Sequence, residues 1–196
     1  MVQELRLINA HGERLYLTKD ERDRFCEASL YAKRSVKSLC QVMHFTGCRA
    51  SEALSICAKH IDLDNRNITI RTLKKRRVEY RLIPVPDALV NDLDNIYGLR
   101  ERTKPKELKE LLFGCSRKTG YNWVTGVMKE AGIREGAHRT PKGLRHGFAI
   151  AALLCEPPVD LYTLSTLMGH SSIETTAAYC KVLGFEKREI VSRMWS

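Results

Sequence analysis

The sequence predicts an α+β fold that is mainly α-helical, with a small antiparallel β-sheet near the middle of the chain. Apolar residues recur at helical spacing over most of the 196 residues. Only residues 67–85 contain stretches that alternate polar and apolar side chains as half-buried strands do. Hydrophobic residues make up 43% of the chain, which is enough for a folded core. We expect one domain over residues 1–196.

Helices are predicted before the sheet from their caps and stripes. Thr18 and Glu21 have the spacing of a capping box, so a helix begins there. A second helix covers residues 35–45, with an apolar stripe, and ends at Gly47. A third helix begins near Ser51.

The predicted sheet is a hairpin of two strands, residues 67–72 and 78–85. The sequence LKKRR lies between them, so the turn is cationic. Pro84 and Pro86 end the second strand, and a helix over residues 87–96 follows.

The rest of the chain is predicted to be helical after a polar surface loop over residues 98–106. Pro141 fits a first helical position, where its missing N–H has no cost. The expected helices cover residues 119–131, 141–154, 159–168, 173–182 and 185–195.

The net charge of +10 and the pI near 9.4 favour a polyanionic partner, and nucleic acid is the obvious one. No apolar run approaches the ~20 residues that span a bilayer, and the N-terminus lacks the apolar core of a signal peptide. We therefore expect no membrane partner and a cytoplasmic protein, in the bacterial cytoplasm or nucleoid.

The 7 cysteines include no C-x-x-C pair and no cluster at zinc-finger spacing. Most stand beside apolar residues, which predicts small buried thiols in a reducing compartment rather than disulfides or a metal site. The phosphate-binding pattern G-x-x-x-x-G-K-[ST] does not occur either. We expect no metal and no other cofactor.

Four local sequence patterns contain the candidate functional residues: TGCRASE, LKKRR, KGLRHGFA and LMGHSSIETTAAY. Each has an ordinary structural explanation if it stands alone, such as a surface ion pair, a solvated turn, a helix cap or a core tyrosine. In chain order, the patterns contain Arg49 with Glu52, Lys74 with Lys75, Arg145, and His170 nine residues before Tyr179.

The order and spacing of these patterns resemble the tyrosine recombinase (phage integrase) family, whose pattern is arginine, hairpin lysine, His-x-x-Arg, Leu-Gly-His and tyrosine. The resemblance runs from about residue 36 to residue 179, roughly three quarters of the chain. It implies the catalytic-domain fold of that family and a site-specific recombinase that cuts and rejoins double-stranded DNA without a metal.

The resemblance also implies a role for each residue. Tyr179 is the nucleophile that forms a 3′-phosphotyrosyl bond, although a free tyrosine has a pKa of about 10. Arg49 and Arg145 bind the phosphate as charged forks that match its oxygens, and His170 donates a hydrogen bond to it. Glu52, three residues after Arg49, is expected from this spacing to orient the guanidinium or the neighbouring structure. Lys74, or alternatively Lys75, protonates the leaving 5′ oxygen.

Lys142 stands where the family pattern has histidine. We expect Lys142 to supply charge and a hydrogen bond to the phosphate, because a lysine with an ordinary pKa of about 10.4 is a poor proton acceptor. His138 lies outside the motif position, and His146 follows Arg145 directly and therefore points about 100° away around the helix. Tyr179 must then lose its proton to water or to another neighbour.

Members of the family commonly carry an additional N-terminal core-binding domain, but only about 35 residues precede the helix that begins near Ser35, so we expect no such domain in this chain. The chain is then either a natural short recombinase or a piece of a larger one. The resemblance further implies a homo-oligomer on DNA, from dimer to tetramer, and accessory DNA-bending proteins as partners. Integration, excision, inversion and resolution of DNA, as in mobile elements, all remain open. Two alternatives are an inactive DNA-binding regulator with the same fold and a topoisomerase with the same chemistry.

Overall fold

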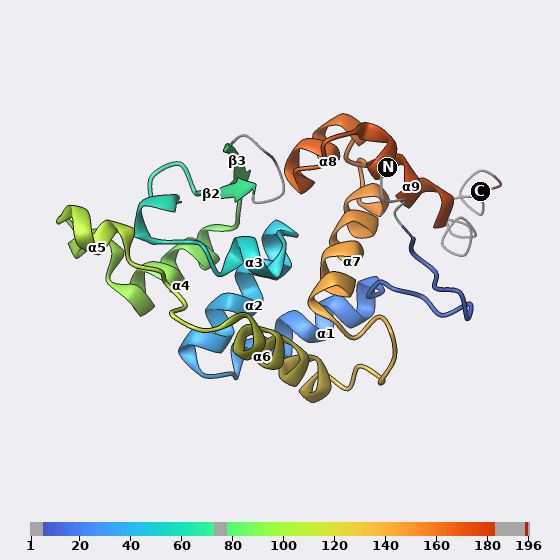
Figure 1. Cartoon of the computed structure of the whole chain (residues 1–196), viewed down its shortest axis with the longest axis horizontal. Coiled ribbons are helices and arrows are strands. Elements are labelled where there is room, and N and C mark those ends of the chain that lie inside the picture. Colours follow the sequence, from blue (N-terminus) through green and yellow to red (C-terminus); the bar gives the residue numbers. More distant parts are fainter. Residues whose placement is uncertain (1–5, 73–77, 183–194, 196) are drawn as a thin grey trace.

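The computed structural model of the chain describes residues 6–72, 78–182 and 195. It is mainly helical with one small antiparallel sheet, as predicted (Figure 1). The helices are α1 (Lys19–Leu30), α2 (Arg34–Thr46), α3 (Ala50–Ala53), α4 (Asp87–Tyr97), α5 (Pro105–Lys109), α6 (Arg117–Glu130), α7 (Pro141–Leu154), α8 (Leu161–Met168) and α9 (Ile173–Val182), with short 3-10 helices η1 (Ala58–His60) and η2 (Leu99–Glu101). The strands are β1 (Ile61–Asp62), β2 (Asn67–Thr72) and β3 (Glu79–Pro84).

Helix α1 begins and helix α2 ends where the caps predict. The Thr18 hydroxyl accepts a hydrogen bond from the backbone N–H of Glu21, and the Glu21 carboxylate accepts one from the backbone N–H of Thr18. Helix α2 ends at Gly47, whose φ of 58° favours glycine. A Cβ atom there would lie 2.4 Å from Cδ1 of Phe148 on α7, so glycine also allows α2 and α7 to pack closely.

The sheet has the order β1-β2-β3, and both pairs are antiparallel. The predicted pairing of the two long strands is confirmed, with Ile68 opposite Ile83 and Ile70 opposite Arg81. Strand β1 was not predicted because two residues are too few to show alternation. The turn that carries Lys74 and Lys75 lies outside the described residues.

The prediction of a plain surface loop over residues 98–106 is wrong in part. The segment contains η2 and the first two residues of α5, and Leu99 is buried. Helix α5 begins at Pro105, where a first-turn proline loses no hydrogen bond. The helix predicted over residues 185–195 falls outside the described part of the chain except for Trp195.

The apolar core is divided into two clusters. The larger one joins α1, α2, α4 and α6 to the inner face of the sheet. The smaller one, which we call the Tyr179 cluster, packs the N-terminal segment (residues 6–17) against α7, α8 and α9. Figure 1 shows this segment on the same side of α7 as α9. The members of the Tyr179 cluster are Leu7, Tyr16, Ala149, Ile150, Leu164, Met168 and Tyr179.

The cysteines are free thiols. Cys40, Cys48 and Cys57 are buried, as expected, whereas Cys155 is exposed and the remaining three are partly buried. Within the described ranges, no helix combines the length and the apolar character that crossing a membrane requires.

Candidate active site

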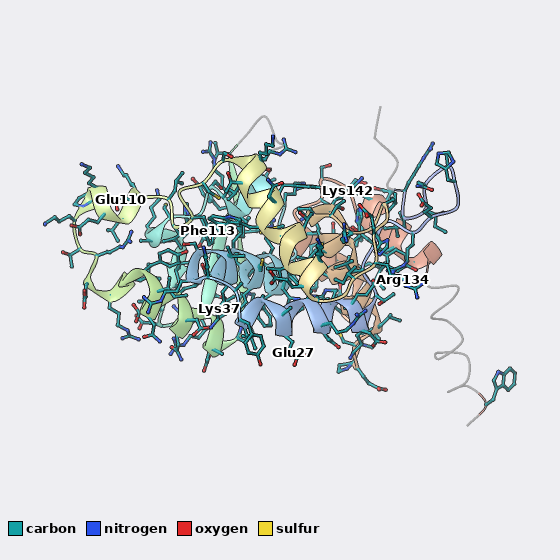
Figure 2. The ribbon with its side chains drawn as sticks, turned by 90° about the horizontal axis from the view of Figure 1, so that it is seen from below. Glu27, Lys37, Glu110, Phe113, Arg134 and Lys142 are labelled. Atoms are coloured by element: carbon teal, nitrogen blue, oxygen red, sulfur yellow. The ribbon has the colours of Figure 1, made fainter. Side chains whose placement is uncertain are left out.

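One cavity of about 970 Å³ brings together side chains that are far apart in the sequence. Its walls come from the α2–α3 junction, α6, the start of α7, the α8–α9 junction and the N-terminal segment. Lys142, which Figure 2 labels, lies in the first turn of α7 and lines the cavity. The predicted site residues that line the cavity are Arg49, Lys142, Arg145, His170 and Tyr179; His146, Arg6 and Arg117 line it as well.

Arg145 is 6% exposed and joins the ends of two helices. Its Nη1 donates to the carbonyl of Gly47 at 2.8 Å, and its Nη2 donates to the carbonyl of Met168 at 2.6 Å. These carbonyls lie at the C-terminal ends of α2 and α8, where the helix dipole favours a cation. Burial lowers the pKa of Arg145 to about 10, so the guanidinium stays charged at neutral pH.

Arg49 is held by Glu52, three residues later. The Glu52 carboxylate is fully buried and accepts hydrogen bonds from Nη1 of Arg49 at 2.7 Å and from its backbone N–H at 3.0 Å. The expectation that Glu52 orients this guanidinium is confirmed. The Arg49 side chain is still 23% exposed, so it can also contact a ligand in the cavity.

Arg81 is a structural residue of the site that we did not predict. Its Nη2 donates to the Glu52 carboxylate at 2.6 Å, its Nε to the carbonyl of Leu167 at 2.8 Å, and its Nη1 to the Thr72 hydroxyl at 3.0 Å. Strand β3 thus holds α3 and α8 together. The available signal was the alternation of β3, which puts Arg81 on the same inward face as Ile83.

His170 lies directly after α8 and packs flat against the nucleophile candidate. Its ring and that of Tyr179 are stacked, with centroids 6.3 Å apart and an interplanar angle of 7°. Its Nδ1 lies 2.9 Å from the Thr176 hydroxyl. Burial, and then the charge of Arg145, lowers the pKa of His170 to about 3, so the ring is neutral and keeps one N–H to donate.

Tyr179 is fully buried in this structure. Burial raises the pKa of its hydroxyl to about 12, although the charges of Arg145 and Arg49 act in the opposite direction. The hydroxyl oxygen lies 2.8 Å from Nδ1 of His146. In this state Tyr179 is therefore a protonated phenol with a hydrogen-bonded partner.

His146 is the functional candidate that the sequence did not give a role. Because it lies about 100° from Arg145 around α7, we placed it away from the phosphate site. The structure shows that α9 packs on that side, so His146 meets Tyr179. The signal that could have found it is a single histidine within the apolar stretch that α7 buries.

Lys142 is exposed and stands in the first turn of α7, one turn before His146. Together with Arg6, Arg49, Arg117 and Arg145 it makes the cavity strongly cationic. Such a cavity is suited to bind an anion such as a phosphodiester. In the described ranges, no three His, Cys, Asp or Glu side chains gather as a metal site would require.

The sequence pattern of the Phage integrase family matches residues 15–184. The chain belongs to this family. Its fold is that of the tyrosine recombinase catalytic domain, as predicted from the four sequence patterns.

Three relatives illustrate the similarity. Tyrosine recombinase XerA of Pyrococcus furiosus is 28% identical over 177 residues, which are 90% of this chain and 60% of the relative. A crystal structure of XerA recombinase superposes with a TM-score of 0.73 at 24% identity, covering 91% of this chain and 64% of the other. The XerH site-specific recombinase bound to palindromic difH substrate, in a post-cleavage complex, has a TM-score of 0.70 at 25% identity, covering 100% and 58%. The chain thus spans about 60% of the length of the first relative.

Proposed function

We propose that this chain is the catalytic domain of a site-specific recombinase that cuts and rejoins double-stranded DNA through a covalent 3′-phosphotyrosyl bond at Tyr179. One observation carries the proposal. Arg49, Arg145, His170 and Tyr179 come from three separate regions of the chain and line one cationic cavity. The similarity to XerH, whose structure contains its DNA substrate, supports DNA as the ligand.

The two arginines bind the scissile phosphate in this proposal. A guanidinium has five N–H donors, and two of those of Arg145 go to backbone carbonyls, which leaves others for phosphate oxygens. The Arg49 side chain lines the cavity and is partly exposed, so its guanidinium can donate further hydrogen bonds to a ligand there. Donors placed where negative charge develops lower the barrier by ~3–4 kcal/mol each.

The cleavage step forms a bond between the Tyr179 oxygen and phosphorus and breaks the bond from phosphorus to the 5′ oxygen. The leaving oxygen takes a proton from the hairpin lysine, Lys74 or Lys75, both of which lie outside the described residues. The phosphotyrosyl bond conserves the energy of the broken bond, so a 5′ hydroxyl from another strand can reverse the step. The cationic side chains supply the charge stabilisation, and the proposed reaction uses neither a metal nor another cofactor.

Exchange of strands between two duplexes needs more than one active site. We therefore propose a DNA-bound homo-oligomer, from dimer to tetramer, with accessory DNA-bending proteins as further partners. The protein would act wherever its DNA lies, in the cytoplasm or nucleoid of a bacterial cell. Integration, excision, inversion and resolution share this cleavage chemistry.

The test is a trapping experiment with nicked duplexes drawn from the DNA that flanks the gene. The nick lets a short fragment diffuse away after cleavage, so a covalent protein–DNA adduct accumulates. We expect adducts that survive denaturation with the wild type and none with Tyr179→Phe, while both proteins bind the duplex. An adduct from the Phe variant would place the nucleophile elsewhere.

The burial of Tyr179 favours one alternative, a DNA-binding regulator in which the tyrosine is only a core residue. That function predicts specific binding to the same duplexes with no adduct from the wild type. A plasmid that carries two copies of the cleaved site distinguishes recombination from topoisomerase activity. A recombinase changes the connectivity of the plasmid, whereas a topoisomerase only relaxes it.

A further inference from the structure

The hydroxyl of Tyr179 and the ring of His146 form an isolated pair in the described part of the chain. His146 Nδ1 is the only hydrogen-bond partner found there for the Tyr179 hydroxyl, at 2.8 Å. The two ring centroids are 5.7 Å apart with an interplanar angle of 58°. His146 is 2% exposed, so bulk water does not compete for this contact.

The hydrogen-bond inventory favours one tautomer of His146. If Tyr179 donates to Nδ1, the ring proton is on Nε2, and Nε2–H is the one buried group of the pair without a partner among the described residues. If Nδ1–H donates instead, both the phenol hydrogen and the Nε2 lone pair lack a partner. An unsatisfied buried group costs ~1–3 kcal/mol, so the first arrangement is more stable. It leaves Nδ1 as an acceptor aimed at the phenol hydrogen.

We propose that His146 is the general base of the cleavage step, accepting the Tyr179 proton at Nδ1 while the Tyr179 oxygen attacks phosphorus. This inference rests on the proposed function and extends it to a residue outside the family pattern quoted above. The phenol O–H bond breaks, its electron pair forms the bond to phosphorus, and its proton moves to Nδ1. In the reverse step, Nδ1 returns the proton to the phenol oxygen as the phosphotyrosyl bond breaks.

The position of His146 on α7 explains how it can take this task. Lys142 and His146 are four residues apart, so both lie on one face of the helix, separated by one turn. Lys142 occupies the position where the family pattern has histidine, and it is an exposed cation. In this chain the proton acceptor is therefore His146, whose neutral ring contacts the Tyr179 hydroxyl one helical turn after the position at which the family pattern has histidine.

Burial and the surrounding charges keep the His146 ring neutral. Burial, followed by the charges of Lys142 and Arg145 on α7 and by His170 beyond α8, lowers the pKa of His146 to about 3. The opposing group on α9 is Tyr179, which is itself protonated. A bound phosphodiester adds negative charge to this cavity and raises the affinity of His146 for a proton. A bound phosphodiester therefore lowers the free-energy cost of the transfer from Tyr179, and the bond that forms to phosphorus drives the step.

His146→Asn is the decisive variant, because Oδ1 of asparagine is bonded to Cγ as Nδ1 is in histidine. It can accept the phenol hydrogen bond but cannot take the proton. We expect its rate of adduct formation at pH 7 to fall by about 100-fold or more, the usual size of general-base catalysis. We also expect its rate to rise from pH 7 to 9 while the wild-type rate stays flat. Imidazole added to His146→Gly should restore part of the rate.

The matched control is His44→Asn. His44 is another buried histidine whose pKa is lowered to about 3 by burial, and it lies outside the cavity. A fall in stability from removal of a buried imidazole affects both variants, whereas the change in pH profile is expected only for His146→Asn. Equal rates and superimposable profiles for His146→Asn and the wild type overturn the inference.

A second measurement needs no DNA. Long-range ¹H–¹⁵N spectra of the histidine rings report which nitrogen carries the proton. We expect the Nε2–H tautomer for His146, with a shift of its Nδ1 resonance in Tyr179→Phe. An Nδ1–H tautomer overturns the inference.

Adduct formation separates the two proposals. If the wild-type protein forms no adduct, the proposed function is wrong, and the role of His146 with it. If the wild type forms adducts and His146→Asn is unaffected, only the role of His146 is wrong.

Discussion

The Glu52 carboxylate lies 2.6 Å from Nη2 of Arg81, and both side chains are buried. The same carboxylate binds Arg49, so one anion connects a cavity arginine to the inner face of the sheet. Arg81 in turn donates to the carbonyl of Leu167, near the end of α8. The guanidinium of Arg49 and the loop that carries His170 are therefore positioned by a single network.

Glu52→Gln should destabilise the protein by about 3–5 kcal/mol, because it leaves Arg81 buried without its counter-charge. It should also slow cleavage, since Arg49 loses its anchor. Urea unfolding measures the first effect and adduct formation the second. Glu107→Gln is the control, because Glu107 pairs with Lys104 at the surface, where such a change is worth at most ~1 kcal/mol. Equal stabilities of the two variants would contradict the network.

Arg49 and Arg145, the two arginines that we assign to the scissile phosphate, should differ in what their replacement by alanine does to stability. Each variant should reduce cleavage by about 100-fold or more, because each removes a donor from the developing charge on phosphate. Arg145→Ala should also lower the unfolding free energy, since the buried carbonyls of Gly47 and Met168 lose their donor. Arg49→Ala should cost less stability because that side chain is partly exposed. Urea unfolding of both variants tests the order, which the opposite ranking would refute.

His44, which does not line the cavity, makes the stability of the protein depend on pH. Its ring lies between Phe25 and Phe45, and burial lowers its pKa to about 3. The pKa of a histidine in the unfolded chain is near 6.5. Between that pH and the folded pKa, the unfolded chain therefore binds a proton at His44 that the folded chain does not bind. The stability from the neutral ring is complete above pH 6.5 and is lost as the pH falls toward the folded pKa.

The free energy of unfolding should therefore decrease from pH 7 to pH 5, and the decrease should be smaller in His44→Phe. Urea titrations at several pH values measure both slopes. If the unfolding free energy has the same pH dependence in wild type and in His44→Phe, the His44 ring takes up a proton in the folded protein as it does in the unfolded chain.

Much of the fold was predictable because helix ends are local features. The capping box at Thr18 and the first-turn proline at Pro141 gave the helix starts that the structure shows. Strand β1 has two residues and helix α5 has five, which are too few to show a period in the sequence. Leu99 is buried within a segment whose composition is that of a surface loop.

The residues of the candidate site could be predicted only where they belong to motifs with a fixed order and spacing in the sequence. Arg49, His170 and Tyr179 were identified from ordered sequence patterns, and they line one cavity. Arg81 lies outside the four patterns, and His146 lies within KGLRHGFA but was given no role there. The contacts of both residues depend on which element packs against them, which the sequence does not show. The partner of Arg81 is a carboxylate on α3, and the partner of His146 is the tyrosine on α9.

Lys142→Met tests the lysine that replaces the usual histidine. If Lys142 donates a charged hydrogen bond to the phosphate, worth ~1.5–3 kcal/mol, its loss should slow cleavage at pH 7 by about 10-fold or more. The charge of Lys142 also contributes, after burial, to the lowered pKa of His146. Removing that charge raises the pKa of His146, so the fall of the rate on the acid side should begin at a higher pH.

Lys142→Arg is the matched control, because it keeps the charge and should keep the acid side of the profile where the wild type has it. Cleavage rates of the three proteins from pH 5 to pH 9, at saturating DNA, separate charge from shape. If Lys142→Met is slower but its pH profile is the same as that of the wild type, the phosphate contact of Lys142 is supported and its effect on the pKa of His146 is refuted. If the wild type, Lys142→Met and Lys142→Arg have equal rates and superimposable pH profiles, Lys142 is an ordinary surface residue. The positive charge at the scissile phosphate would then come from the arginines and the hairpin lysine.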